Sequence, residues 1–267
     1  MELNFGKNST VDTLSPLKNG LKSLKRLGLK HLLDYDKENL VSLVDNCKEL
    51  NCIQLPFGVV GGNTISELIH LKKDKLKQLE IGMEDTDCWL HSLKDCPNLD
   101  SLTIGRMLIT KSGFEAISEL KNLRKLQLGY YNDNYGKGFK ADDQIQILFN
   151  GKFKRLKKLC IYGIVDSIDA IFASTAYACP NVQYLELQCI TDNRKDFSKN
   201  TIIILLSNLP ELKQVKIEWL LNPYENHATD NPIFVKTQFE EIVGKCKNGF
   251  QVLIGENDDY VQIVREM

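Results

Sequence analysis

The sequence predicts an α/β solenoid, a right-handed horseshoe with a parallel β-sheet on its concave side and helices outside. One observation is a short pattern, apolar-x-x-apolar-x-apolar, which recurs eight times along 267 residues. A second is its spacing, because the first positions of successive copies lie 26, 26, 23, 24, 33, 26 and 30 residues apart. A third is the helical spacing of apolar residues between copies. A unit of this size cannot bury its apolar face alone, so neighbouring units must stack.

The three apolar positions of each copy predict a short strand whose pattern residues point inward while the residues between them point outward. A period in this range with this pattern is the signature of leucine-rich repeats. We therefore predict a single leucine-rich repeat domain over residues 1–267, with about nine or ten repeats. The eight copies are Leu24-Leu27-Leu29, Leu50-Ile53-Leu55, Leu76-Leu79-Ile81, Leu99-Leu102-Ile104, Leu123-Leu126-Leu128, Leu156-Leu159-Ile161, Val182-Leu185-Leu187 and Leu212-Val215-Ile217.

Helices are predicted between the strands, because apolar residues there recur at positions i, i+3, i+4 and i+7. This spacing occurs over residues 40–47 and 239–246, and a shorter form of it occurs over 114–120. Thr64 with Glu67 has the spacing of a capping box, and Ser112 has the form of a second N-cap. Prolines at 97, 180 and 210 are expected after a helix and before a strand, where a proline ends the helix without removing a hydrogen bond that the sheet needs.

The two ends of the chain differ from the central units. Leu3 and Phe5 fit the last two apolar positions of a strand, so the sequence opens inside a repeat and the N-terminus is expected to be truncated. Val252 and Ile254 predict a last strand, and the charged tail over 256–266 is expected to cap it.

Charge and cysteine content exclude several classes of partner. The net charge is −1, which gives no electrostatic basis for binding nucleic acid or an anionic membrane. No apolar run is long enough to span a bilayer and the start does not resemble a signal peptide, so we expect a cytoplasmic or nuclear location. Four of the eight cysteines, at 47, 96, 179 and 246, precede strands, where we expect reduced, buried filler. With no Cys-x-x-Cys pair and scattered histidines, neither a metal nor a cofactor is expected.

Three segments point to a subclass of these repeats. Residues 96–104 (Cys-Pro-Asn-Leu-Asp-Ser-Leu-Thr-Ile) and 179–187 (Cys-Pro-Asn-Val-Gln-Tyr-Leu-Glu-Leu) resemble the cysteine-containing repeat of F-box proteins. Residues 109–117 (Ile-Thr-Lys-Ser-Gly-Phe-Glu-Ala-Ile) resemble the helix entry of that subclass, with Lys111 in place of the usual Asp. The resemblance implies repeats that bind a ubiquitylation substrate. It implies the Skp adaptor as a partner only if an F-box exists upstream, because none is visible in this sequence.

The open face of the sheet is the expected binding surface of a solenoid. Large amphipathic side chains gather in its C-terminal half, and tyrosine and tryptophan are enriched at binding hot spots. For any single residue the alternative is a solvated face with no particular partner. The predicted partner-binding residues of these strands are Tyr162, Tyr184, Glu186, Gln188, Lys216, Glu218 and Trp219.

Three repeats are overlong, at 129–139, 191–200 and 222–232, and each insertion follows a strand. Insertions at one point of the unit project from one edge, which is often a binding edge. The first insertion adds Tyr130, Tyr131 and Tyr135 to the predicted partner-binding residues. Tolerated surface loops without a partner remain the alternative.

No catalytic residue is predicted. Serine, histidine and aspartate occur without a recognisable signature, and carboxylate pairs such as Asp142-Asp143 fit a helix start. The sequence thus favours a non-enzymatic module that binds one or more proteins, resembling the substrate-recognition repeats of a ubiquitin ligase. The alternative is a stand-alone scaffold or inhibitor similar to ribonuclease-inhibitor-like repeat proteins.

Overall fold

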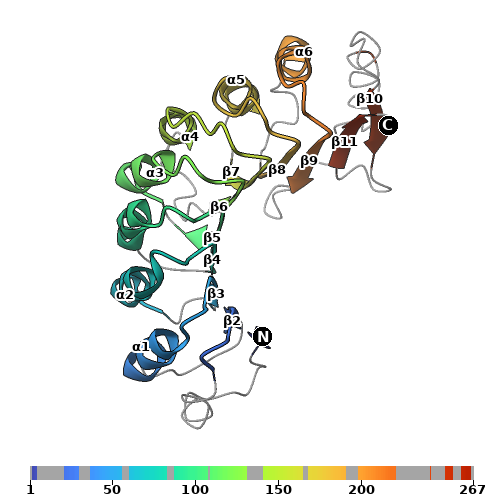
Figure 1. Cartoon of the computed structure of the whole chain (residues 1–267). Helices are drawn as coiled ribbons and strands as arrows, with labels where there is room; N and C mark the ends of the chain where they lie inside the picture. The colour runs from blue at the N-terminus through green and yellow to red at the C-terminus, as the bar shows by residue number, and fades with distance from the viewer. Residues whose placement is uncertain are drawn as a thin grey trace. The chain divides into compact units, whose positions relative to one another are not determined.

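The computed structural model of the chain forms two compact units, residues 1–131 and 132–267. Each unit is a β-sheet with helices on one face (Figure 1). The structure describes residues 2–4, 21–29, 37–55, 60–82, 87–107, 109–130, 141–164, 168–190, 198–220, 241, 250–254 and 260–265.

The first unit contains parallel strands that follow one another in the sheet in chain order. Each helical segment packs against the next one along the chain. Its elements are β1 (Glu2–Asn4), β2 (Arg26–Gly28), α1 (Lys37–Asn46), β3 (Cys52–Leu55), α2 (Gly62–Lys72), β4 (Gln78–Ile81), the 3₁₀ helix η3 (Cys88–Asp95), β5 (Ser101–Met107), α3 (Lys111–Ser118) and β6 (Lys125–Tyr130).

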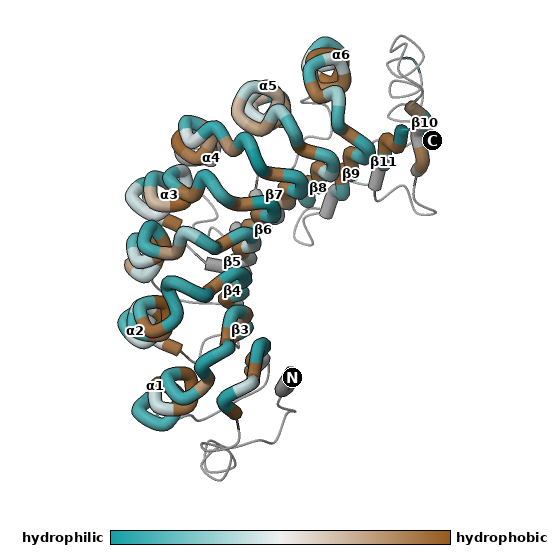
Figure 2. The backbone as a smooth tube through the Cα atoms, in the orientation of Figure 1, coloured by the Kyte–Doolittle hydropathy of each residue, from teal (hydrophilic) through white to brown (hydrophobic). Residues whose placement is uncertain are grey.

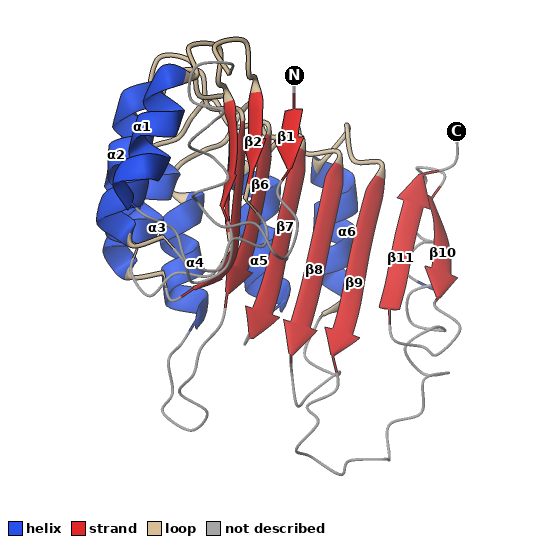
Figure 3. Ribbon diagram, turned by 90° about the horizontal axis from the view of Figure 1, so that it is seen from below, coloured by secondary structure: helices blue, strands red, loops and turns tan. Residues whose placement is uncertain are grey.

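The second unit starts with the same strand-and-helix alternation and ends in a hairpin. Strands β7, β8 and β9 are parallel, whereas β11 runs antiparallel to both β9 and β10 (Figure 3). Its elements are α4 (Ala141–Phe149), β7 (Lys158–Ile164), α5 (Ile168–Ala178), β8 (Tyr184–Ile190), α6 (Lys199–Asn208), β9 (Gln214–Leu220), β10 (Phe250–Ile254) and β11 (Tyr260–Arg265).

The sheet is parallel as predicted except at one strand of this hairpin, β11. The predicted strand at Val252 and Ile254 exists as β10, but the charged tail does not simply cover it, because part of that tail forms β11. Only residues 255–259 connect the two strands. A parallel crossover needs a dozen or more residues, so a connection this short forces antiparallel pairing. As a result β11 lies next to β9, and β10 becomes the outer strand.

The eight predicted strand patterns form the core. All 24 pattern residues, from Leu24 to Ile217, are buried, with no more than 4 % of their surface exposed. In each unit hydrophobic residues recur along the strands and the helices, with hydrophilic stretches between them (Figure 2). Burial of this pattern is the main stabilising term of a stacked repeat array.

The helix predictions are confirmed in position and partly wrong at their starts. In α1 the buried residues are Leu40, Leu43 and Val44, as the periodicity indicates. Thr64 does not cap α2, because that helix already begins at Gly62. Ser112 does not cap α3, whose N-cap is Thr110, with its hydroxyl accepting a hydrogen bond from the Gly113 N–H. The predicted helix over 239–246 lies outside the described residues apart from position 241.

The cysteine prediction is confirmed at three of its four positions. Cys47, Cys96 and Cys179 are free and buried before their strands, and Cys246 lies outside the described part. Burial raises the pKa of each of these three thiols, to about 11 for Cys96 and about 12 for Cys179. Such thiols stay protonated and act as small apolar groups.

Asparagines before the strand pattern connect successive repeats. The Asn98 side-chain amide donates to the Asp74 carbonyl at 2.7 Å, and Asn181 donates to the Lys154 carbonyl at 2.7 Å. Asn122 makes the same kind of bond, to the carbonyl of residue 97 at 2.9 Å. The Cys-Pro-Asn motif is therefore explained in part by stacking, since its asparagine ties one turn to the turn before it.

Candidate functional site

The candidate site is the open face of β7, β8 and β9 in the second unit, here called the β7–β9 face. Parallel pairing in register places its side chains in three rows across the strands. The rows are Lys158-Tyr184-Gln214, Cys160-Glu186-Lys216 and Tyr162-Gln188-Glu218.

Strand alternation is what brings these residues to one face. Between them lie Leu159, Leu185 and Val215, and then Ile161, Leu187 and Ile217, all buried on the helix side. Because successive side chains of a strand point to opposite faces, each polar residue between two buried ones must point to the open face. The hydrophobic pattern therefore fixes the register of the polar grid as well as that of the core.

The charges of the middle and last rows compensate one another. The Lys216 ammonium lies 3.4 Å from a Glu218 carboxylate oxygen and 4.0 Å from one of Glu186. On the other side, the Lys158 ammonium lies 3.8 Å from Glu186. The Gln188 amide donates to Glu218 at 3.2 Å. The two lysines and two glutamates sum to no net charge, and their contacts hold the side chains in place.

A buried cysteine lies beneath this network. Cys160 is fully buried although it occupies an outward position, and its thiol donates to a Glu186 carboxylate oxygen at 3.7 Å. Burial raises the pKa of Cys160. Burial also raises the pKa of Tyr162, and the neighbouring Cys160 and Glu186 raise it further. Both groups therefore stay neutral, and neither is activated for nucleophilic chemistry.

Tyr184 is more exposed to solvent than Tyr162, the other tyrosine in the three rows of this face. It is 39 % exposed and lies in the first row, between Lys158 and Gln214. A tyrosine presents a rigid apolar ring and a hydroxyl, which is why it is frequent at binding hot spots.

The structure brings together six of the ten predicted partner-binding residues: Tyr162, Tyr184, Glu186, Gln188, Lys216 and Glu218. Two others are placed only by their backbones. Trp219 in β9 lies opposite Cys189, and Tyr130 ends β6 opposite Met107. Tyr131 and Tyr135 lie outside the described residues, as does most of each insertion, so the predicted binding edge stays a prediction.

Two features of this face were not predicted from the sequence: Cys160 and the contribution of the hairpin. Gln262 of β11 lies opposite Lys216, and Leu253 of β10 lies opposite Gln262, so the middle row continues across the hairpin. Leu253 is 44 % exposed. The strand alternation would have identified Cys160 as outward-facing, whereas the hairpin gave no signal of its direction.

Catalytic geometry is not evident in the described residues. In the first unit the Ser112 hydroxyl lies 2.9 Å from the His91 ring, and both side chains are exposed. A third group must orient such a histidine. The nearby Asp87 carboxylate accepts hydrogen bonds from the backbone N–H and hydroxyl of Thr110 instead, at 2.7 and 2.8 Å.

Within the described ranges no group of three or more His, Cys, Asp or Glu side chains could hold a metal ion. No helix there has the length and apolar character needed to cross a bilayer.

Comparison with known proteins identifies the fold. No family model and no curated protein matches the chain. The crystal structure of a complex of TLR13 with ssRNA13 matches over 82 % of this chain at 15 % identity, with a TM-score of 0.51. The fold is a leucine-rich repeat solenoid.

This chain spans only 29 % of the TLR13 chain that it matches, so the leucine-rich repeat fold is what the two have in common. A second solved structure is the leucine-rich repeat-containing protein LegL7 from Legionella pneumophila. It matches over 92 % of this chain and 98 % of its own length, at 12 % identity and a TM-score of 0.41.

Proposed function

We propose that this leucine-rich repeat chain is a single, non-catalytic repeat module that binds a protein partner through the β7–β9 face. The observation that carries the proposal is Tyr184, 39 % exposed beside a network of hydrogen-bonded and ion-paired side chains. Binding costs conformational entropy whenever a long side chain must be ordered at an interface. Side chains already held by their neighbours reduce that cost, so this face is preorganised for binding.

The charge balance of the face defines the partner class further. Lys158 and Lys216 are compensated by Glu186 and Glu218, so the face offers no excess positive charge for phosphates. A protein surface that hydrogen-bonds to the polar rows and packs on Tyr184 fits better than a nucleic acid does. Because the charges are paired, we expect binding to depend only weakly on salt concentration.

The finer proposal is that the partner is a ubiquitylation substrate and that the chain is the recognition part of an F-box type ligase. Its support is the resemblance of residues 96–104 and 179–187 to the repeats of that family. Asn98 and Asn181 within those segments have a stacking role, so they do not argue for the ligase by themselves. The alternative is a stand-alone scaffold or inhibitor. For either role we propose the cytoplasm or nucleus, where buried free cysteines such as Cys179 stay reduced.

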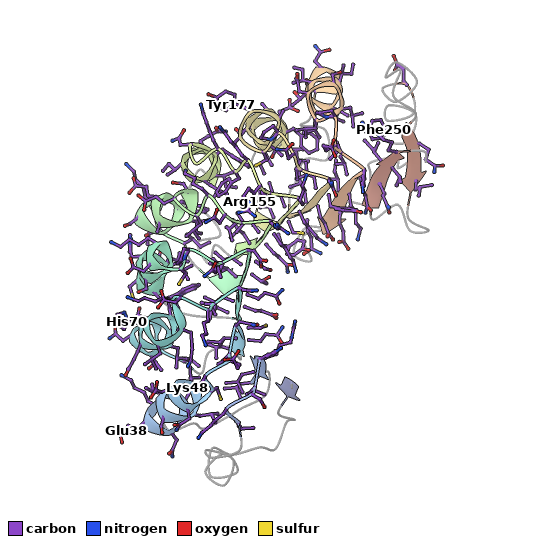
Figure 4. The ribbon with its side chains drawn as sticks, in the orientation of Figure 1. Glu38, Lys48, His70, Arg155, Tyr177 and Phe250 are labelled. Carbon is purple, nitrogen blue, oxygen red and sulfur yellow. The ribbon has the colours of Figure 1, made fainter. Side chains whose placement is uncertain are left out.

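The test of partner binding compares two tyrosines on opposite faces of the second unit. Tyr184 lies on the β7–β9 face, whereas Tyr177, 69 % exposed, lies on α5 (Figure 4). Affinity purification from the native cell with quantitative mass spectrometry is done for the wild type, Tyr184→Ala and Tyr177→Ala. We expect a partner that Tyr177→Ala recovers in the same amount as the wild type does. Tyr184→Ala should recover at least tenfold less of it. A partner retained by both variants would overturn the assignment of this face.

The same experiment separates the ligase from the scaffold. Recovery of Skp and cullin subunits together with the Tyr184-dependent protein would support the ligase role. One stoichiometric Tyr184-dependent partner without those subunits would support the scaffold or inhibitor.

A further inference from the structure

Strand β10 lies at the outer edge of the second unit's sheet. Its inner edge pairs with β11 over all five residues from Phe250 to Ile254. Among the strands that the structure describes, none pairs with its other edge. Alternate backbone N–H and C=O groups of such a strand point outward and can accept another strand.

The composition of β10 is unusual for a sheet edge. Its sequence, Phe-Gln-Val-Leu-Ile, contains no charge, no proline and no glycine. Natural edge strands are usually protected by charged residues, prolines or short length. The first strand of the first unit, β1, is only three residues long and carries Glu2. In the described part of the chain no charged residue, proline or further strand protects this edge, which indicates a surface that pairs with another strand.

The two faces of β10 differ as a paired strand requires. Phe250 is 6 % exposed, and the Arg265 guanidinium lies over its ring, 4.9 Å from the ring centre. Val252 lies opposite the buried Ile263. Gln251 and Leu253 are exposed on the other face. Phe250 therefore lies on the buried face and Gln251 and Leu253 lie on the exposed face, and an added strand with the same alternation of faces would match both.

We propose that β10 pairs with β10 of a second copy of this chain, antiparallel and centred on Val252. This arrangement places Phe250 opposite Ile254, Gln251 opposite Leu253 and Val252 opposite itself. Phe250, Val252 and Ile254 then meet apolar residues, whereas the exposed Leu253 lies next to Gln251 of the second copy. The strand is thus self-complementary about a two-fold axis, as an isologous dimer requires.

The charges that flank β10 in the sequence favour antiparallel self-pairing. Lys245 and Lys247 precede the strand, and Glu256, Asp258 and Asp259 follow it. Antiparallel pairing directs the basic flank of one copy toward the acidic flank of the other, whereas parallel pairing would bring like charges together. Five residues per strand make a small interface, so the dimer is weak and its population depends on protein concentration.

Charge placement across the two-fold axis gives a matched pair of variants. Gln251→Lys with Leu253→Lys puts lysines directly opposite each other twice, which destabilises strand pairing. Gln251→Lys with Leu253→Glu puts opposite charges at the same positions. Both double variants change exposed side chains of one strand, so each serves as the folding control for the other. Circular dichroism melts should show the same cooperative unfolding for both.

The readout is sedimentation velocity over a concentration series of the full chain. We expect the wild type to dimerise reversibly, the like-charge variant to weaken the dimer by about tenfold or more, and the opposite-charge variant to retain it. A wild type that stays monomeric at every concentration, or a dimer that both variants weaken equally, would overturn the proposal.

Hydrogen exchange of the wild type tests the pairing without any substitution. Amides of the peptide that contains residues 250–254 should exchange more slowly at high than at low protein concentration, while those of β7 should not change. Concentration-independent exchange at 250–254 would contradict self-pairing. Neither result depends on whether the β7–β9 face binds a protein, so the two proposals fail separately.

Discussion

Asp169 of α5 accepts a hydrogen bond from the backbone N–H of Ser198 with both of its carboxylate oxygens, at 2.8 and 2.9 Å. Ser198 is the N-cap of the next helix, α6. The first unit repeats the arrangement, since Asp87 accepts from the N–H of Thr110, the N-cap of α3. An acidic residue of one repeat thus holds the start of the helix in the following repeat.

This contact predicts a stability effect at Asp169. We expect Asp169→Ala to lower the free energy of unfolding by about 1–2 kcal/mol, because the Ser198 N–H loses a charged acceptor. Asp169→Asn keeps an acceptor oxygen and should cost less. Urea unfolding followed by circular dichroism measures both changes. Equal losses for the two variants would mean that hydrogen bonding to the cap is not the cause.

Close approach of backbones predicts a larger effect at Gly105 in the first unit. A Cβ atom there would collide with the carbonyl oxygen of Gly82 and lie 2.7 Å from its carbonyl carbon. The β5–β6 register also shifts next to this residue. We expect Gly105→Ala to lower the free energy of unfolding by about 1–3 kcal/mol or more, because backbone must move to make room.

Gly61 is the matched control for Gly105, because a Cβ atom built on it meets no atom within 4 Å. Gly61→Ala changes an N-cap residue and should cost no more than about 1 kcal/mol. Thermal melts of the two alanine variants give the comparison. If Gly61→Ala were as destabilising as Gly105→Ala, crowding would not explain the Gly105 effect.

The sequence predicted the core well because the signal is local and repeated. Residues such as Leu27 and Leu126 recur at a fixed period, and the same alternation identifies Glu186 and Lys216 as outward residues. The sequence did not predict the distances between the Lys216 ammonium and the carboxylates of Glu186 and Glu218, because these depend on which carboxylate oxygen the lysine approaches.

Two failures have physical reasons of their own. Thr110 and Ser112 both suit an N-cap, and Thr110 holds the position with contacts from Asp87, which lies 23 residues earlier. The place of β10 in the sheet could not be read from Val252 and Ile254, because their period of two does not tell which strand lies next to β9. The short connection explains only why β10 and β11 are antiparallel to each other.

Burial of Cys179 predicts a loss of stability at alkaline pH. Its pKa is raised to about 12 in the folded state, whereas a thiol in the unfolded chain titrates near about 8.5. Above about pH 9 the unfolded state releases a proton that the folded state keeps. The free energy of unfolding should therefore fall as pH rises toward 12, by up to about 1.4 kcal/mol per pH unit for this group.

Cys179→Ala removes that titration while leaving the other alkaline groups in place. Urea unfolding at several pH values between 8 and about 11 should give a shallower decline for the variant than for the wild type. The comparison uses slopes, so the small cavity left by alanine does not affect it. Parallel pH profiles would show that Cys179 does not contribute.

The last prediction concerns the ion pair at the centre of the β7–β9 face, between Lys216 and Glu186. Both side chains are about one quarter exposed, at 26 % and 25 %, and the charged atoms are 4.0 Å apart. Pairs with this much solvent contact are worth about 0.2–1 kcal/mol. We therefore expect a coupling energy in that range from a double-mutant cycle of Lys216→Met and Glu186→Gln, measured by urea unfolding.

A small coupling has a functional consequence. Lys216→Met should leave the chain folded but release the Glu186 and Glu218 carboxylates from their shared cation and give the face a net negative charge. The free energy of partner binding should then change more than the free energy of unfolding does. Binding should also become dependent on salt, because the negative charge is no longer balanced. Titrations of the partner at low and high ionic strength separate these effects. Unchanged affinity at both would mean that the ordered charges of this face do not contribute to recognition.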